Sequence, residues 1–491
     1  MKRLLAGLCS AGLAWPGGAL LAQSDPVANS ATAPIVSETP LDNPGSGGAG
    51  LLSSRVTGLP GTLWIGSDPM RLRELITAAR PAVPALRELL HTLMLAEADP
   101  PASGAAGIAH LGARLDWLIR LGAVEEAQAL IEIAGHDTPE LFSRWADLNL
   151  LLGQTNAPCA ALRSTPGLSN DIALRIFCTA RSGDWQRATL LLGSARTLGD
   201  LPARDVDLLE RFLDDALAEE RPALIPPVRP TPLEFRLFEA MGEPLPTAPL
   251  PLAFSVLDLG GDNGWRAQIE AAERLARVGA LPANQLLGLY TLREPAASGG
   301  VWDRIDALQD FEKALNRGAP DAVSLALPKV WSQMASAGLL VPFADLFAER
   351  LVGLGLSGRA SRMALRSVFL SPGYEALSSR IGDEGPEVRF LTAIARGQMP
   401  PDAGVVALPH SAAVAAGFSG AQIPAVLHEQ LAQGRLGEVI LRAVALFNSG
   451  ADGNAADLTD ALVTLRGIGL EDVARRAALQ LMILDAERAR R

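Results

Sequence analysis

The chain has little of what catalytic and metal sites are usually built from. Its 491 residues include only three cysteines, five histidines and two tyrosines. No paired-cysteine or His-Glu-x-x-His spacing is present, so we predict no metal site. A Gly-x-Ser-x-Gly nucleophile turn is also missing, which removes the commonest sign of a serine hydrolase. We therefore predict no enzyme and no cofactor, and we interpret all five histidines as surface or helix-end residues: His91, His110, His136, His410 and His428.

Two kinds of polar cluster in the sequence could be mistaken for ligand sites. The glycine-rich stretch 260–264 superficially resembles a phosphate or calcium loop, but it lacks the Lys-Ser/Thr pair of the first and the alternating carboxylates of the second. We interpret it as a turn in which Asp262 or Asn263 caps a helix that begins near Trp265. Carboxylate pairs such as Glu125 with Glu126 lie on polar helix faces, so we expect them in solvent.

Positive charge is scarce as well. The formal net charge is −11, which argues against a nucleic-acid partner because such proteins usually carry a basic face. Hydrophobic residues make up 48% of the chain, yet beyond the N-terminus they are divided among amphipathic segments, and no run is long enough to cross a bilayer. We predict no integral membrane segment in the mature chain.

The N-terminus has the pattern of a secretory signal peptide over residues 1–22. Lys2 and Arg3 precede an apolar stretch that ends in small residues near Ala22. A retained anchor is the alternative, but 16–18 (Pro-Gly-Gly) interrupts the stretch. Lipidation of Cys9 is not indicated, because Leu8 precedes it where a small residue is needed. Lysine occurs only three times while arginine is abundant, which suggests a GC-rich bacterial genome, so we expect the periplasm as the location.

Composition divides the remaining chain into four parts. Residues 23–60 are rich in Ser, Ala, Pro and Gly, and we predict a disordered linker there. Residues 61–220 and 258–491 carry helical periodicity and form two predicted helical blocks. Between them, 221–257 has prolines too frequent for uninterrupted helix, and we interpret it as an ordered connector. The predicted fold class is all-α, an α-solenoid of antiparallel helical hairpins.

The stretch 168–196 is the clearest example of such a hairpin. Ser169 and Asn170 are suited to cap a first helix, which Gly183 ends. Asp184 is suited to cap the second helix. The apolar face of the first helix is predicted at Ile172, Ile176, Phe177 and Ala180, and that of the second at Trp185, Ala188, Leu191 and Leu192.

The turn Gly183, Asp184 and Trp185, with Ala188 five residues after the glycine, resembles the helix junction of a tetratricopeptide repeat. The same spacing without the aromatic recurs at Gly122 with Ala127 and at Gly469 with Ala474, and looser copies lie at Gly279, Gly338 and Gly434. These glycines follow no fixed period near the roughly 34 residues of that family, so the resemblance implies a degenerate array. An ordinary all-α protein with unrelated helix pairs is the alternative.

Stacked hairpins produce extended curved surfaces that often bind other proteins. By that analogy we predict a non-enzymatic scaffold or adaptor for a protein or peptide partner in the cell envelope. The alternative is a peptidoglycan-binding or glycan-active protein, because helical arrays also resemble the doughnut-shaped part of soluble lytic transglycosylases. The Glu-Ser dipeptide of that family is absent here.

Finally, we predict a disulfide between Cys159 and Cys178, the two cysteines that remain after the signal peptide. If the helices that carry them are antiparallel, their axial offset is only about 4 to 5 Å at the usual helical rise. Such an offset is compatible with the Cα separation of a disulfide. The alternative is two buried free thiols.

Overall fold

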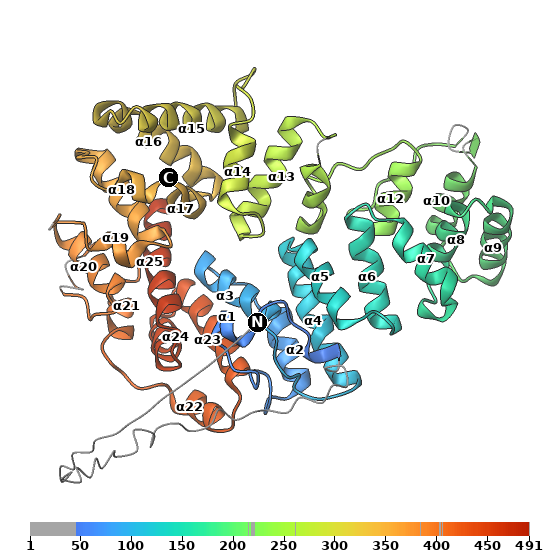
Figure 1. Cartoon of the computed structure of the whole chain (residues 1–491), viewed down its shortest axis with the longest axis horizontal. Helices are drawn as coiled ribbons and strands as arrows, with labels where there is room; N and C mark the ends of the chain where they lie inside the picture. The colour runs from blue at the N-terminus through green and yellow to red at the C-terminus, as the bar shows by residue number, and fades with distance from the viewer. Residues whose placement is uncertain are drawn as a thin grey trace, which may run out of the picture. The chain divides into compact units, whose positions relative to one another are not determined.

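The computed structural model describes residues 46–490 except 215, 218–220, 261, 383, 402, 403 and 405. The described residues are helical and contain no β-strand, which confirms the all-α class (Figure 1). The predicted signal peptide 1–22 and the linker as far as residue 45 lie outside them.

The first helices are α1 (Ser54–Thr57), α2 (Pro69–Ala78), α3 (Pro84–Leu95), α4 (Ala105–Leu121), α5 (Val124–Ala134), α6 (Pro139–Leu151), α7 (Asn156–Ser164), α8 (Ile172–Arg181), α9 (Trp185–Leu198), α10 (Ala203–Leu213) and α12 (Pro232–Ala240). The later ones are α13 (Trp265–Val278), α14 (Ala283–Tyr290), α15 (Val301–Asn316), α16 (Pro320–Ala337), α17 (Leu340–Leu351), α18 (Gly358–Leu370), α19 (Tyr374–Ser378), α20 (Pro386–Ala395), α21 (Ser411–Gly417), α22 (Ala425–Ala432), α23 (Leu436–Ala451), α24 (Ala455–Gly467) and α25 (Glu471–Arg488). Short 3₁₀ segments occur at η1 (Ser46–Gly48), η2 (Pro166–Leu168) and η3 (Leu252–Leu259).

The predicted disordered linker is wrong over its last part. Gly47 and Ala49 are buried, and the backbone N–H groups of Leu51 and Leu52 both donate to the Leu95 carbonyl at the end of α3. These bonds satisfy a carbonyl that the helix itself leaves free. Residues 47–52 and Leu59 are therefore packed against the helices, because their apolar side chains find a partner that lies outside the local sequence, whereas 53–56 are exposed.

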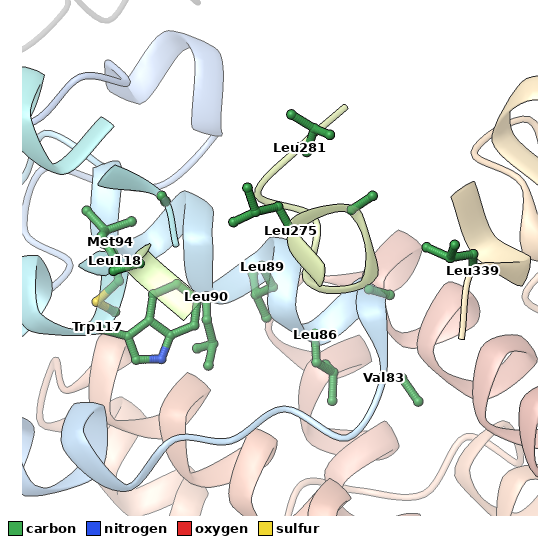
Figure 2. Close-up of a cluster of buried hydrophobic side chains, with 14 of the residues drawn as sticks. Val83, Leu86, Leu89, Leu90, Met94, Trp117, Leu118, Leu275, Leu281 and Leu339 are labelled. Atoms are coloured by element: carbon green, nitrogen blue, oxygen red, sulfur yellow. The ribbon is translucent and has the colours of Figure 1, made fainter. Parts of the chain in front are cut away.

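The helices at the two ends of the described chain pack against each other. α3 contacts α25, and the backbone N–H of Ala85 donates to Gln480 Oε1 at 2.7 Å. The N–H of Ala82 likewise donates to Asn448 Oδ1 of α23 at 2.9 Å. Figure 2 shows apolar side chains of α3 meeting those of α4, α13 and the segments after α13 and α16, namely Val83, Leu86, Leu89, Leu90, Trp117, Leu118, Leu275, Leu281 and Leu339. One hydrophobic core thus joins segments far apart in sequence.

Arginine side chains tie helix ends to neighbouring helices. Arg114 of α4 is fully buried and donates to the carbonyls of Met94 and Ala96, both at 2.9 Å. Arg277 of α13 donates to the Ala337 carbonyl at the end of α16 at 2.7 Å. The last carbonyls of a helix have no partner within it, and a guanidinium carries five donors and a charge that suits the negative helix end. Similar bonds to carbonyls at or near helix ends come from Arg87, Arg120, Arg236, Arg466 and Arg475.

The surface position predicted for His110 is wrong. This side chain lies in the middle of α4, is only 1% exposed and packs edge-on against Trp64 with ring centroids 4.9 Å apart. Burial, together with the nearby Arg114 charge, lowers the pKa of His110 to about 3. It is therefore a neutral core residue. Leu111 and Leu115 of the same helix are buried as well.

The proline-rich stretch 221–257 contains α12 and most of η3, which continues to Leu259. A capping box opens α12: Thr231 accepts from the Glu234 N–H, and Glu234 accepts from the Thr231 N–H. Its apolar side chains Leu233, Phe235, Leu237 and Phe238 are buried. The cap predicted for α13 is wrong, because Gly264 occupies that position and the Asn263 side chain donates to the Leu257 carbonyl instead.

Candidate functional site

The three glycine turns of the sequence pattern share one backbone geometry. Gly122, Gly183 and Gly469 have φ values of 84°, 89° and 88°, in the left-handed region that favours glycine. The small residue five positions later is fully buried in each case: Ala127, Ala188 and Ala474. At Gly122 a Cβ would lie 2.5 Å from Leu275 Cδ2, so glycine also permits a close approach to α13.

The hairpin α8–α9 is capped by aspartates. Asp184 accepts from the Arg187 N–H at 3.1 Å and begins α9, as its sequence position predicts. The first cap is different from the prediction: Asp171, not Ser169 or Asn170, accepts from the Leu174 N–H and begins α8. The Ser169 hydroxyl instead accepts from the Asp171 N–H, because the segment before the cap turns back on itself.

A disulfide links this hairpin to α7. Cys159 of α7 and Cys178 of α8 are bonded, with a Cα separation of 4.9 Å. The predicted pairing is confirmed, and both half-cystines are buried. α7 is thereby fixed to α8 by a covalent bond as well as by packing.

The exterior of α9 contradicts part of its predicted apolar face. Ala188 and Leu192 are buried, but Trp185 is 48% exposed and Leu191 is 37% exposed. Leu190 and Leu198 are still more exposed, at 72% and 74%. α9 packs on α8 and α10, and the rest of its circumference carries leucines that are exposed among the described residues.

A groove of about 350 Å³ lies beside the disulfide and reaches this exposed face. Its walls include three arginines, Arg163, Arg175 and Arg187, against one carboxylate, that of Asp184, and Leu191 also lines it. Arg175 donates to the Ser169 carbonyl at 2.9 Å. Among the described residues, neither Arg163 nor Arg187 has a carboxylate within ion-pair distance. The groove thus combines unpaired positive charge with apolar surface.

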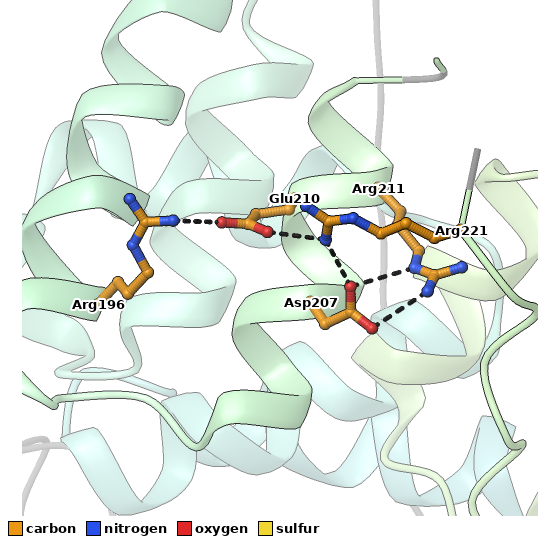
Figure 3. A network of polar contacts seen from close by, with 5 residues as sticks. All are labelled: Arg196, Asp207, Glu210, Arg211 and Arg221. Carbon is orange, nitrogen blue, oxygen red and sulfur yellow. Dashed lines mark hydrogen bonds and ion pairs between the residues drawn. The ribbon is translucent and has the colours of Figure 1, made fainter. Parts of the chain in front are cut away.

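An ion-pair network fixes the other side of α9 (Figure 3). Arg196 of α9 pairs with Glu210 of α10 at 2.7 Å, and Arg221 bridges Glu210 and Asp207 at 2.9 and 2.7 Å. Hydrogen bonds from Arg211, and then from Arg221, lower the pKa of Asp207. The network orients α9 and the start of the proline-rich stretch, where Ile225 and Val228 are also exposed.

A cavity of about 710 Å³ lies between α5, α12, η3 and α13. Glu125, Glu126, Asp258 and Arg236 line it. Glu125 is exposed, as predicted, and the Glu126 side chain is 38% exposed. Among the described residues no cluster of three or more His, Cys, Asp or Glu side chains is arranged to hold a metal ion.

Sequence reasoning placed the disulfide and the turns but missed the exposed leucines of α9. The signal for exposed leucines was the run Leu190, Leu191 and Leu192, because Leu190 falls outside the periodic apolar face. In the described part of the chain, no helix has both the length and the apolar character to span a bilayer. Comparisons with family models, curated proteins and solved structures each gave no match.

Proposed function

We propose that this chain is a non-enzymatic scaffold or adaptor of the periplasm, built from stacked, tetratricopeptide-like helical hairpins. In this proposal, residues 61–220 and 258–491 form two solenoid blocks joined by the connector 221–257. The buried small residues after Gly122, Gly183 and Gly469 support the hairpin interpretation, because they let paired helices approach closely. The disulfide supports a location outside the reducing cytoplasm.

The observation that carries the proposal is the surface formed by Arg163, Arg187, Leu190, Leu191 and Leu198, which we call the α9 surface. Its leucines are exposed and its arginines have no carboxylate partner among the described residues. Between Asn156 and Leu198 the sequence has five arginines and two aspartates, although the whole chain is acidic with a net charge of −11. A local basic surface on an acidic protein favours an oppositely charged partner.

The partner that fits this surface is an acidic, amphipathic peptide segment. Its apolar side chains would cover the leucines of α9, and its carboxylates would pair with Arg163 and Arg187 in the groove beside the disulfide. Arginine is well suited to such a contact because its planar fork binds carboxylates in a bidentate manner.

The test uses two labelled synthetic helical peptides, one with leucines at i, i+3, i+4 and i+7 among glutamates, the other with lysines in place of the glutamates. Anisotropy titration of the full chain should show binding of the acidic peptide alone. Leu190→Gln combined with Leu198→Gln should weaken it at least tenfold, and so should Arg163→Gln combined with Arg187→Gln. Leu325→Gln is the matched control, since Leu325 is 82% exposed on α16. Equal binding to all variants would overturn the proposal.

The glycan-active alternative is tested separately by incubation with purified peptidoglycan. Release of soluble muropeptides would overturn the non-enzymatic assignment, whereas an unchanged sacculus alongside peptide binding supports the adaptor.

A further inference from the structure

A second basic hollow lies on a different part of the chain, between α16, α18 and α25. Its volume is about 430 Å³. Arg359, Arg362 and Arg366 line it from one face of α18, because positions i, i+3 and i+7 of a helix point the same way. Arg490, just after α25, supplies a fourth guanidinium, and Trp331 and Ser332 of α16 complete the wall.

A polar network around the buried Arg366 borders this hollow. Arg366, whose side chain is 4% exposed, bonds to Glu387 at 2.6 Å and also to Glu487. Glu487 additionally accepts from Trp331 Nε1 at 3.0 Å and pairs with Arg490 at 3.1 Å. These ion pairs fix the buried Arg366, whereas Arg490 is 58% exposed and pairs with Glu487 at the edge of the hollow.

The arginines at the rim of the hollow have no such ion pairs among the described residues. Arg359 and Arg362 are exposed, and no carboxylate of the described residues lies within ion-pair distance of either. Glu487 is the single carboxylate among the lining residues, against four arginines. The hollow therefore has a surplus of positive charge on a chain whose net charge is −11.

We propose that this hollow binds a small phosphate compound with two or more negative charges, such as a phosphate monoester or an oligophosphate. Guanidinium groups suit this ligand because each donates two parallel N–H bonds to phosphate oxygens. Arg359 and Arg362 bind the anion directly, and the Ser332 hydroxyl donates to it. Arg366 adds positive charge from its buried position, and the exposed Arg490 adds it from the edge of the hollow. The volume admits a ligand of several heavy atoms beyond one phosphate group.

The test is calorimetric titration of the full chain with pyrophosphate, and with citrate as a carboxylate anion of similar charge. We expect saturable pyrophosphate binding that weakens as sodium chloride is raised, since exposed charges are screened. Arg359→Gln and Arg362→Gln should each weaken it at least tenfold and leave the melting temperature of the unliganded protein unchanged. Arg73→Gln, an exposed arginine on α2, is the matched control.

Absence of saturable binding, or equal binding by Arg359→Gln and the control, would overturn the proposal. Citrate binding as tight as pyrophosphate binding would overturn the assignment to phosphate compounds. Because the α9 surface shares no residue with this hollow, Arg359→Gln should bind the acidic peptide normally.

Discussion

Two helices that follow the same kind of turn have opposite surroundings. α9 comes after Gly183 and buries Ala188, and α25 comes after Gly469 and buries Ala474. α25 then continues with side chains that are buried on all sides, against α3, α18, α20 and α24. α9 instead leaves Leu190 and Leu198 in solvent. The turn sequence sets the contact within a helix pair, and the place of that pair among the other helices sets what covers its remaining faces.

Matched leucine truncations should show the largest difference between α25 and α9. Leu479→Ala in α25 removes a fully buried side chain and should cost about 3 kcal/mol of unfolding free energy. Leu190→Ala in α9 should change it by less than about 0.5 kcal/mol, because that side chain already contacts water. Urea unfolding of both variants measures the difference. Similar losses would show that α9 is covered in solution.

Removal of the disulfide should have an effect nearly as large. Cys159→Ala combined with Cys178→Ala opens a loop with a sequence separation of 19, and should lower the free energy of unfolding by about 3 kcal/mol. α25 needs no such bond because packing holds it on several sides. Alkylation without reduction, followed by peptide mapping, checks the bond itself: separate alkylated Cys159 and Cys178 peptides would contradict it.

A pH titration probes Asp147 of α6, the helix that packs against the disulfide-bonded α7. Burial, and then the nearby Asp171 carboxylate, raises the pKa of Asp147 to about 7 from 3.8. Because the folded chain then binds this proton more tightly than the unfolded chain, the stability it contributes is full below pH 3.8 and is lost as the pH rises to about 7. Asp147→Asn should therefore stabilise the protein at pH 8, by on the order of 2 kcal/mol.

Melting temperatures at pH 4 and pH 8 measure this effect. The gain from Asp147→Asn should appear at pH 8 and vanish at pH 4. No gain at pH 8 would mean that the carboxylate is solvated, and an equal gain at both values would mean that it does not arise from ionisation. The stability contributed by His110 depends on pH in the opposite direction. Its pKa is lowered from 6.5 to about 3, so its contribution is present above pH 6.5 and is lost as the pH falls toward 3.

The smallest effects are expected at the turns. Gly183→Ala and Gly469→Ala should each cost about 1 kcal/mol, because both glycines have positive φ and nothing lies within 4 Å of an added Cβ. Here the two hairpins should behave alike in thermal unfolding. A much larger loss of stability in Gly469→Ala would indicate a packing contact that the structure does not show.

Local chemistry made part of this fold predictable. Asp68 caps α2 and Asn454 caps α24, because a short polar side chain before a periodic helix bonds to the N–H three residues on. The disulfide followed from helix lengths and a single pairing. The burial of His110, the packing of residues 47–52 and the exposed leucines of α9 depend on contacts from distant segments, which one sequence does not reveal. The arginine hollow was missed for the same reason, since Trp331, Arg362 and Arg490 meet only in three dimensions.

The contact between α3 and α25 has a consequence for how the chain acquires its structure. Ala85 and Gln480 are 395 positions apart, and a chain is made from its N-terminus. Until α25 has been synthesised, the apolar side chains of α3 that pack against it have no native partner and can form non-native contacts. Contacts that close so large a loop form late and slow the final folding step. α25 is therefore synthesised long after α3 and yet completes its packing.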